Sequence, residues 1–257
     1  MKRTIERFFE KFGYSIRNIN SSYSDIKEKE FWDIYELCKP YTMTSLERMY
    51  SLFCSVKYII TNNIYGDFVE CGVWKGGSAM LIAYVLKNYK INNKKIFLYD
   101  TFEGMSDPTE NDITNKGEVA KVELKKSSKY DSNSIWCYSP FDEVRNNLEK
   151  TGYLSKNMIQ IKGKVEDTLP KNVPPNGISL LRLDTDWYES TFHELKTLYP
   201  LLSLNGILII DDYGIWEGCR KAVDEYMNQS NLKILLVRID GTARIGIKTS
   251  AIEIKTK

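Results

Sequence analysis

The stretch that decides the fold runs from Ile178 to Tyr213 and reads ISLLRLDTDWYESTFHELKTLYPLLSLNGILIIDDY. Two short aliphatic runs, 178–183 and 206–210, enclose a segment with helical spacing, and Pro200 marks the end of that segment. Short and nearly uninterrupted aliphatic runs are typical of strands that are buried on both faces of a parallel sheet. The stretch therefore predicts a strand–helix–strand unit inside an α/β fold.

Four carboxylates follow these two strands. Asp184 and Asp186 come after the first strand, and Asp211 and Asp212 come after the second. Parallel strands end at the sheet edge where ligands bind, so we expect the four acids to gather there. Such acids repel one another unless a cation neutralises them. Because this ligand set contains neither Cys nor His, the pattern favours a hard ion such as Mg²⁺ over Zn²⁺.

A second candidate site lies in GDFVECGVWKGGS, residues 66–78. A short strand ends at Glu70, glycines form a tight turn, and a helix begins at Ser78, which is the usual start of a nucleotide-binding doubly wound sheet. The spacing departs from G-x-G-x-x-G. An acid at Glu70 would repel a pyrophosphate but would suit a cationic ligand such as S-adenosylmethionine. The alternative is a glycine turn that only connects strand and helix.

The next strands carry further binding candidates. KIFLYD, residues 95–100, ends in Asp100, and an acid at this position typically hydrogen-bonds ribose hydroxyls. A helix N-cap is the plain alternative for Asp100. After a strand at 158–161, the segment 163–166 occupies the position where an adenine ring lies in a doubly wound fold. Together with the glycine turn, these features predict an adenosine-type ligand.

The C-terminal part completes the predicted sheet. A helix over 216–227 precedes two strands, 232–237 and 243–247, with an Asp240-Gly241 hairpin turn between them. The expected fold is α/β, a Rossmann-like class I methyltransferase fold. It has a seven-stranded, mostly parallel sheet with helices on both faces and a C-terminal antiparallel hairpin. NAD-binding Rossmann domains generally lack that hairpin.

Two segments stand apart from this plan. Residues 1–40 are predicted to form a helical extension, which either packs on the core or carries a homo-oligomer interface. Residues 103–140 lie within the predicted methyltransferase domain, 41–257, and are long, polar and poorly periodic. Such a segment is typical of a lid that sets acceptor specificity or of a mobile insertion. Met105, Trp136 and Tyr138 are candidates to close over a substrate.

Composition limits the remaining classes of function. The 257 residues include 36 basic and 34 acidic side chains, and the near balance argues against general nucleic-acid binding. The five cysteines are scattered and lack C-x-x-C spacing, so we expect reduced thiols. Reduced thiols are typical of a cytoplasmic protein, which is therefore expected. Neither a signal peptide nor a membrane span is visible.

Six motifs resemble, in the expected order, those of the macrocin O-methyltransferase family. They are YTMTS from 41, GDFVECGVWKGGS from 66, DTFEGM from 100, GKVEDTLP from 163, LRLDTDWYEST from 181 and GILIIDDYG from 206. The resemblance implies Mg²⁺- and S-adenosylmethionine-dependent methylation of sugar hydroxyls on natural products. Thr185 is a departure, because many relatives have Gly between the two acids.

The resemblance also implies roles for individual positions. The methyl donor would be held by Thr42, Met43, Glu70, Gly72, Ser78, Asp100, Gly163, Val165 and Glu166. Asp184, Asp211 and Asp212 would bind Mg²⁺. Asp184 would also take part in catalysis, and Asp186 would be the general base or orient the acceptor. The only histidine, His193, is another candidate base, although it lies beside a helical apolar stripe that is typical of a core.

The predicted function is methyl transfer from S-adenosylmethionine to a hydroxyl of a sugar or glycosylated small molecule. An NAD-dependent oxidoreductase is one alternative, but it needs a glycine pattern that this chain lacks. The others are a metal-dependent phosphoesterase and a non-catalytic nucleotide-binding protein whose first forty residues bind a partner. The acceptor and the choice between Asp186 and His193 as base stay open at this point.

Overall fold

A computed structural model describes residues 23–131 and 134–249. The chain divides into two compact units, residues 1–33 and 34–257. In the first, the described residues include the start of helix α3 (Lys29–Cys38). Much of the predicted N-terminal extension lies outside the described residues, and a homo-oligomer interface there stays a prediction. All five cysteines are free thiols, as predicted. No helix in the described ranges is long and apolar enough to cross a membrane.

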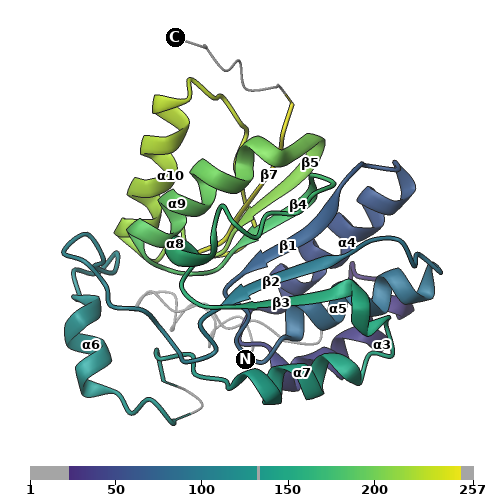
Figure 1. Cartoon of the computed structure of the whole chain (residues 1–257), viewed down its shortest axis with the longest axis horizontal. Helices are drawn as coiled ribbons and strands as arrows, with labels where there is room; N and C mark the ends of the chain where they lie inside the picture. Colours follow the sequence, from purple (N-terminus) through teal and green to yellow (C-terminus); the bar gives the residue numbers. More distant parts are fainter. Residues whose placement is uncertain (1–22, 132–133, 250–257) are drawn as a thin grey trace, which may run out of the picture. The chain divides into compact units, whose positions relative to one another are not determined.

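The second unit is built on a seven-stranded sheet of order β3-β2-β1-β4-β5-β7-β6 (Figure 1). Its parallel strands are β1 (Asp67–Cys71), β2 (Ile96–Asp100), β3 (Met158–Lys162), β4 (Ile178–Leu183) and β5 (Leu202–Ile210). Strand β7 (Arg244–Ile247) pairs antiparallel with β5, and β6 (Val237–Arg238) pairs antiparallel with β7. The predicted Rossmann-like fold is confirmed, although β6 is shorter than expected.

Helices cover both faces of the sheet. Figure 1 shows α8, α9 and α10 on one side and α4, α5 and α7 on the other. Their bounds are α4 (Leu46–Thr61), α5 (Gly77–Asn88), α7 (Phe141–Glu149), α8 (Val165–Thr168), α9 (Tyr188–Leu198) and α10 (Glu217–Gln229), with short 3₁₀ turns η1 (Lys39–Tyr41), η2 (Ser155–Asn157) and η3 (Tyr199–Leu201). Strands β1 and β4 are buried along their whole length between these two layers.

The carboxyl ends of the central strands lie level with one another. Cys71 of β1 is in register with Leu183 of β4, which is in register with Ile210 of β5. The residues that follow these strands therefore emerge at one edge. Gly72 makes this approach possible, because its φ is +81° and a Cβ there would lie 2.0 Å from the carbonyl oxygen of Asp184.

The described part of the predicted lid is packed onto that edge. It contains helix α6 (Ala120–Lys126), which the sequence did not predict, and an isolated bridge joins Thr114 to Trp216. Buried Asp112 accepts the backbone N–H of Tyr188 at 2.8 Å and so caps the start of α9. Trp136 donates its indole N–H to the Leu124 carbonyl at 3.0 Å, so its ring is part of the packing within the segment.

Candidate active site

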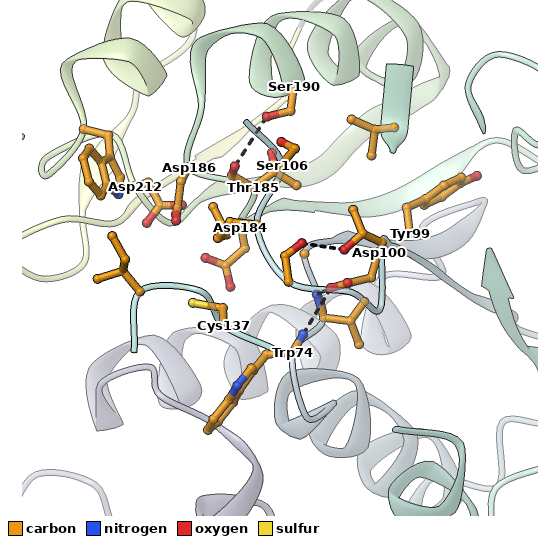
Figure 2. A pocket seen from close by; sticks show the side chains of 18 of the residues that line it. Trp74, Tyr99, Asp100, Ser106, Cys137, Asp184, Thr185, Asp186, Ser190 and Asp212 are labelled. Carbon is orange, nitrogen blue, oxygen red and sulfur yellow. Dashed lines mark hydrogen bonds between the residues drawn. The ribbon is translucent and has the colours of Figure 1, made fainter. Parts of the chain in front are cut away.

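A pocket of about 340 Å³ lies at the carboxyl ends of the parallel strands (Figure 2). Its walls come from the loops after β1, β2, β3, β4 and β5 and from the predicted lid, which contributes Met105, Ile135 and Cys137. Trp136 and Tyr138, which were predicted to close over a substrate, are not among the lining residues. The pocket is thus built largely from the loops in which the sequence placed the binding residues.

The nine predicted donor-binding residues separate into two groups. Six of them line the pocket, namely Met43, Gly72, Asp100, Gly163, Val165 and Glu166. Thr42, Glu70 and Ser78 do not. Thr42 instead shares a hydroxyl–hydroxyl bond of 2.9 Å with Thr44, and Thr44 is the residue that lines the pocket.

Ser78 is buried in the first turn of α5. Its hydroxyl lies 3.9 Å from the sulfur of Met49. The preceding Gly77 allows the chain to pass closely over this turn, because a Cβ there would lie 2.5 Å from the carbonyl oxygen of Tyr41. The start of α5 is therefore packed against residues 41–42, which the sequence motif alone did not reveal.

Glu70 lies one residue before the end of β1, in register with Arg182 of β4. Its Oε1 accepts a hydrogen bond from Arg182, and the side chain is 1% exposed. An internal ion pair thus stands where we predicted a contact with a cationic ligand. Burial raises the pKa of Glu70 to about 7, and the charge of Arg182 opposes that shift.

Asp100 lines the pocket and also holds the glycine turn. Its Oδ2 accepts the backbone N–H groups of Val73 at 2.7 Å and Trp74 at 3.3 Å (Figure 2), and its Oδ1 accepts that of Phe102 at 2.6 Å. Burial raises the pKa of Asp100, and these backbone bonds oppose the rise. The side chain of Thr101 is a further hydrogen-bond partner of this carboxylate.

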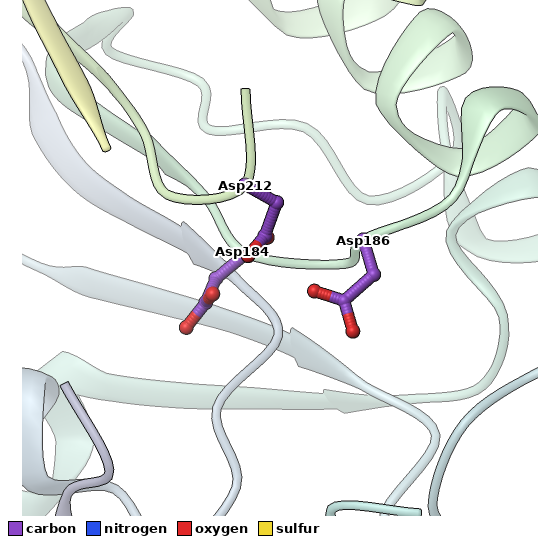
Figure 3. A group of neighbouring side chains, drawn as sticks. All are labelled: Asp184, Asp186 and Asp212. Carbon is purple, nitrogen blue, oxygen red and sulfur yellow. The ribbon is translucent and has the colours of Figure 1, made fainter. Parts of the chain in front are cut away.

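Three carboxylates face the pocket from the loops after β4 and β5. Oxygens of Asp184, Asp186 and Asp212 all lie within 4.8 Å of one another (Figure 3). Burial raises the pKa of each, that of Asp186 to about 7, and the charges of the neighbouring acids raise these pKa values further. Such a group needs a proton or a cation to relieve its repulsion.

Asp211, the remaining predicted ligand, is not one of these three carboxylates but lies beside them, because Nη2 of Arg182 bonds to both Asp184 and Asp211. It is fully buried, and its Oδ2 accepts from Arg182 and, at 3.2 Å, from Arg48. Its Oδ1 has no hydrogen-bond partner within the described ranges, so its role as a ligand stays a prediction.

Two arginines, Arg182 and Arg48, form ion pairs with the acids, and neither role was predicted from the sequence. Arg182 is 4% exposed and pairs with Asp184 at 2.7 Å as well as with Glu70 and Asp211. Arg48 links Asp211 to the hairpin turn through Asp240, at 2.7 Å. The available signal was a single charge, Arg182, inside an otherwise apolar strand.

The donor atoms of this site suit a hard divalent cation. They are carboxylate oxygens, and Asp212 Oδ2, like Asp211 Oδ1, is buried without a partner in the part of the chain that the structure describes. Buried carboxylate oxygens are costly unless a cation or a proton satisfies them. His193 does not line the pocket, and its Nε2 lies 3.3 Å from the carbonyl oxygen of Leu169. The geometry therefore favours Asp186 over His193 as the base.

Comparison with known proteins extends these observations. The family model described as Macrocin-O-methyltransferase (TylF) matches residues 14–245. The chain is 33% identical over 200 residues to demethyldecarbamoylnovobiocin O-methyltransferase of Streptomyces niveus, covering 78% of this chain and 72% of that protein. It is 33% identical over 211 residues to a 2,3-dimethoxy-rhamnosyl-tetracenomycin-C 4′-O-methyltransferase of Streptomyces olivaceus, covering 82% and 77%.

Solved structures agree with the sequence relatives. The O-methyltransferase NovP superposes with a TM-score of 0.70 at 32% identity, covering 82% of this chain and 83% of NovP. The calicheamicin methyltransferase CalS11 has a TM-score of 0.59 at 15% identity, covering 92% of this chain and 95% of CalS11, and shares the fold. These comparisons give no support to the oxidoreductase or the non-catalytic alternative. The chain belongs to the macrocin O-methyltransferase family and is an S-adenosylmethionine-dependent O-methyltransferase.

Proposed function

We propose that the protein transfers a methyl group to a hydroxyl of a sugar or glycosylated small molecule and that it uses Mg²⁺ to do so. One observation carries this proposal. The glycine turn with Asp100 and the carboxylates of Asp184, Asp186 and Asp212 line the same pocket. A donor on the first wall and an acceptor on the second would therefore meet inside it. The S. olivaceus relative is named for a rhamnosyl-bearing acceptor, which supports a sugar-bearing acceptor here.

The donor side is assigned from the residues that line the pocket. Asp100 and the Gly72 turn would hold the ribose, and the segment 163–166 would lie against the adenine. Met43 and Thr44 would contact the amino-acid end. When bound, S-adenosylmethionine supplies a methyl group on a positively charged sulfur. Asp100 keeps the turn in place through its bonds to the Val73 and Trp74 amides.

The metal side is assigned to Asp184, Asp212 and the unpartnered Oδ1 of Asp211. Arg182 and Arg48 already occupy Asp211 Oδ2, which leaves Oδ1 as the oxygen in need of a cation. Mg²⁺ would acidify an acceptor hydroxyl, as metal ions acidify bound water. This arrangement leaves Asp186 free of the ligand set. If Asp186 is a ligand instead, Asp186→Asn should abolish divalent-ion binding as well as turnover.

Asp186 is the proposed general base. Its backbone is left-handed, with a φ of +66°, and its carboxylate lies within hydrogen-bonding reach of Asp212. In the proposed step an oxygen of Asp186 accepts the proton of the acceptor hydroxyl. The acceptor oxygen then forms a bond to the methyl carbon, and the carbon–sulfur bond breaks to leave a neutral thioether. Apolar lining residues such as Ile135, Ile215 and Trp216 would keep water from competing.

The test is transfer of a tritiated methyl group to a panel of free sugars, nucleotide sugars and glycosylated aromatic compounds, with Mg²⁺ and with EDTA. We expect Mg²⁺-dependent labelling of at least one sugar hydroxyl. Full activity in EDTA would remove the metal from the proposal. Labelling confined to acceptors without a sugar would contradict the proposed acceptor class.

A cytoplasmic location stays a prediction from the cysteine content.

A further inference from the structure

Two side chains of α9, Ser190 and Glu194, form hydrogen bonds with the loop between β4 and α9. The hydroxyl of Thr185 donates to the carboxyl group of Glu194, at 3.0 Å from Oε1 and 3.2 Å from Oε2. The carbonyl oxygen of Thr185 accepts the backbone N–H of Trp187 at 2.7 Å and the hydroxyl of Ser190 at 3.4 Å (Figure 2). Ser190 and Glu194 are four residues apart and therefore lie on one face of the helix. Hydrogen bonds thus restrain both the side chain and the backbone carbonyl of Thr185.

Thr185 lies directly between the two acids of the loop. Asp184 precedes it and Asp186 follows it. Asp186 adopts a left-handed backbone conformation, with a φ of +66°, which is unfavourable for a residue with a side chain. Such a conformation persists only where the surroundings impose it. The contacts of Thr185 are the neighbouring restraint that can do so.

Glu194 has no role in the proposed chemistry apart from its contact with Thr185. Its side chain is fully buried, it does not line the pocket, and the proposed chemistry does not use it. Besides Thr185 it contacts the thiol of Cys71, at the end of β1. Burying a carboxyl group is costly, so a fully buried one that touches neither ligand nor solvent needs a structural reason.

We infer that Glu194 is a positioning residue that acts through the hydroxyl of Thr185 to hold Asp186 beside Asp184 and Asp212. The inference rests on the proposed function, because the orientation of Asp186 matters for turnover only if Asp186 serves methyl transfer. The bond itself can be tested separately from turnover.

Two substitutions of Thr185 separate the hydroxyl from the shape of the side chain. Thr185→Val removes the hydroxyl and keeps the branched shape, whereas Thr185→Ser keeps the hydroxyl and is the matched control. The exchange of backbone amides with deuterium is measured in protein without metal or donor. In Thr185→Val we expect the amides of residues 185–187 to exchange about fivefold faster or more, because one hydrogen bond is lost. Thr185→Ser should exchange within about twofold of wild type.

Turnover supplies the second measurement. In Thr185→Val we expect kcat to fall about fivefold or more, with little change in the KM for the acceptor and in S-adenosylmethionine affinity, and Thr185→Ser should restore kcat. Glu194→Gln keeps an acceptor oxygen and should stay close to wild type. Adding Glu194→Leu to Thr185→Val should cause little further loss, because both remove one contact.

The outcomes are distinct. Unchanged exchange or unchanged kcat in Thr185→Val would overturn the inference, and so would equal losses in Thr185→Val and Thr185→Ser. A wild-type protein that methylates none of the acceptors would overturn the proposed function. In that case the exchange comparison would still decide whether the contact with Glu194 holds the loop.

Discussion

Replacing Asp212 by asparagine should separate the stability of the site from its function. Asp212 is 7% exposed, and its Oδ2 has no hydrogen-bond partner among the described residues. Its carboxylate has oxygens of Asp184 and Asp186 within 4.8 Å. Asparagine keeps the size of the side chain and removes one negative charge from this group. We therefore expect the substitution to weaken metal binding without destabilising the metal-free fold.

The magnitude follows from charge and distance. Two unit charges 4.8 Å apart repel by about 3.5 kcal/mol at an effective dielectric constant of about 20. Because burial and the neighbouring acids raise the pKa values of Asp186 and Asp212, protons neutralise part of this charge in the metal-free protein, and we expect a gain of about 1 kcal/mol in the variant. Loss of a direct ligand should weaken Mg²⁺ affinity by about 100-fold or more, since even residues that only support ligands contribute about 10- to 100-fold.

Thermal denaturation with and without Mg²⁺ measures both effects. At a concentration of about 100 times Kd, Mg²⁺ should stabilise the wild type by about 2.7 kcal/mol, which corresponds to a rise in Tm of roughly 5–11 °C for a chain of this size. Asp212→Asn should show almost none of that rise. Asp142→Asn, at an exposed position on α7, is the control and should behave as wild type. An undiminished rise in Asp212→Asn, with turnover in EDTA, would refute the reasoning.

Three further predictions concern the surrounding residues. Asp100→Ala should weaken S-adenosylmethionine binding about tenfold or more, measured by calorimetry, because it releases the glycine turn, and an unchanged Kd relative to exposed Asp107→Ala would contradict this. Arg182→Met should cost about 3–5 kcal/mol in urea denaturation, since it leaves buried acids uncompensated; a cost below about 1 kcal/mol, similar to exposed Arg145→Met, would argue against the ion-pair role. The pKa of Asp186 is raised from 3.8 to about 7 by burial, so the folded state holds this proton over a pH range where the unfolded state has lost it. Without Mg²⁺, the free energy of unfolding of wild type relative to Asp186→Asn should therefore fall by roughly 3 kcal/mol between about pH 4 and 7, and a flat difference would count against this pKa.

Several parts of the fold could be predicted because their signals are local. The runs 178–183 and 206–210 are aliphatic enough to identify buried parallel strands, and the Asp240-Gly241 turn identifies the hairpin. The order of strands, acids and glycines along the chain also places Asp100, Asp184 and Asp212 at the pocket. Helix α6 was missed, because its buried face consists of only Ala120 and Leu124 within a short charged segment of a long insertion.

The contacts that the sequence did not predict share a physical cause. Glu70 was expected to meet a cationic ligand, but the cation beside it is Arg182, 112 residues away in sequence. Asp211 was grouped with Asp212, yet Arg48 and Arg182 reach it from another helix and another strand. Ser78 was expected to bind the donor, but it faces Met49. In each case the partner comes from a distant part of the chain.

The amino-acid sequence by itself determined which acids follow which strands, because strand, turn and helix periodicities are properties of neighbouring residues. It also carried the motifs of the family. Only the tertiary structure decided which oxygens face the pocket and which face an arginine. The contacts of Asp211 and Asp212 depend on elements that folding brings together, because Arg48 and Arg182 reach Asp211 from another helix and another strand.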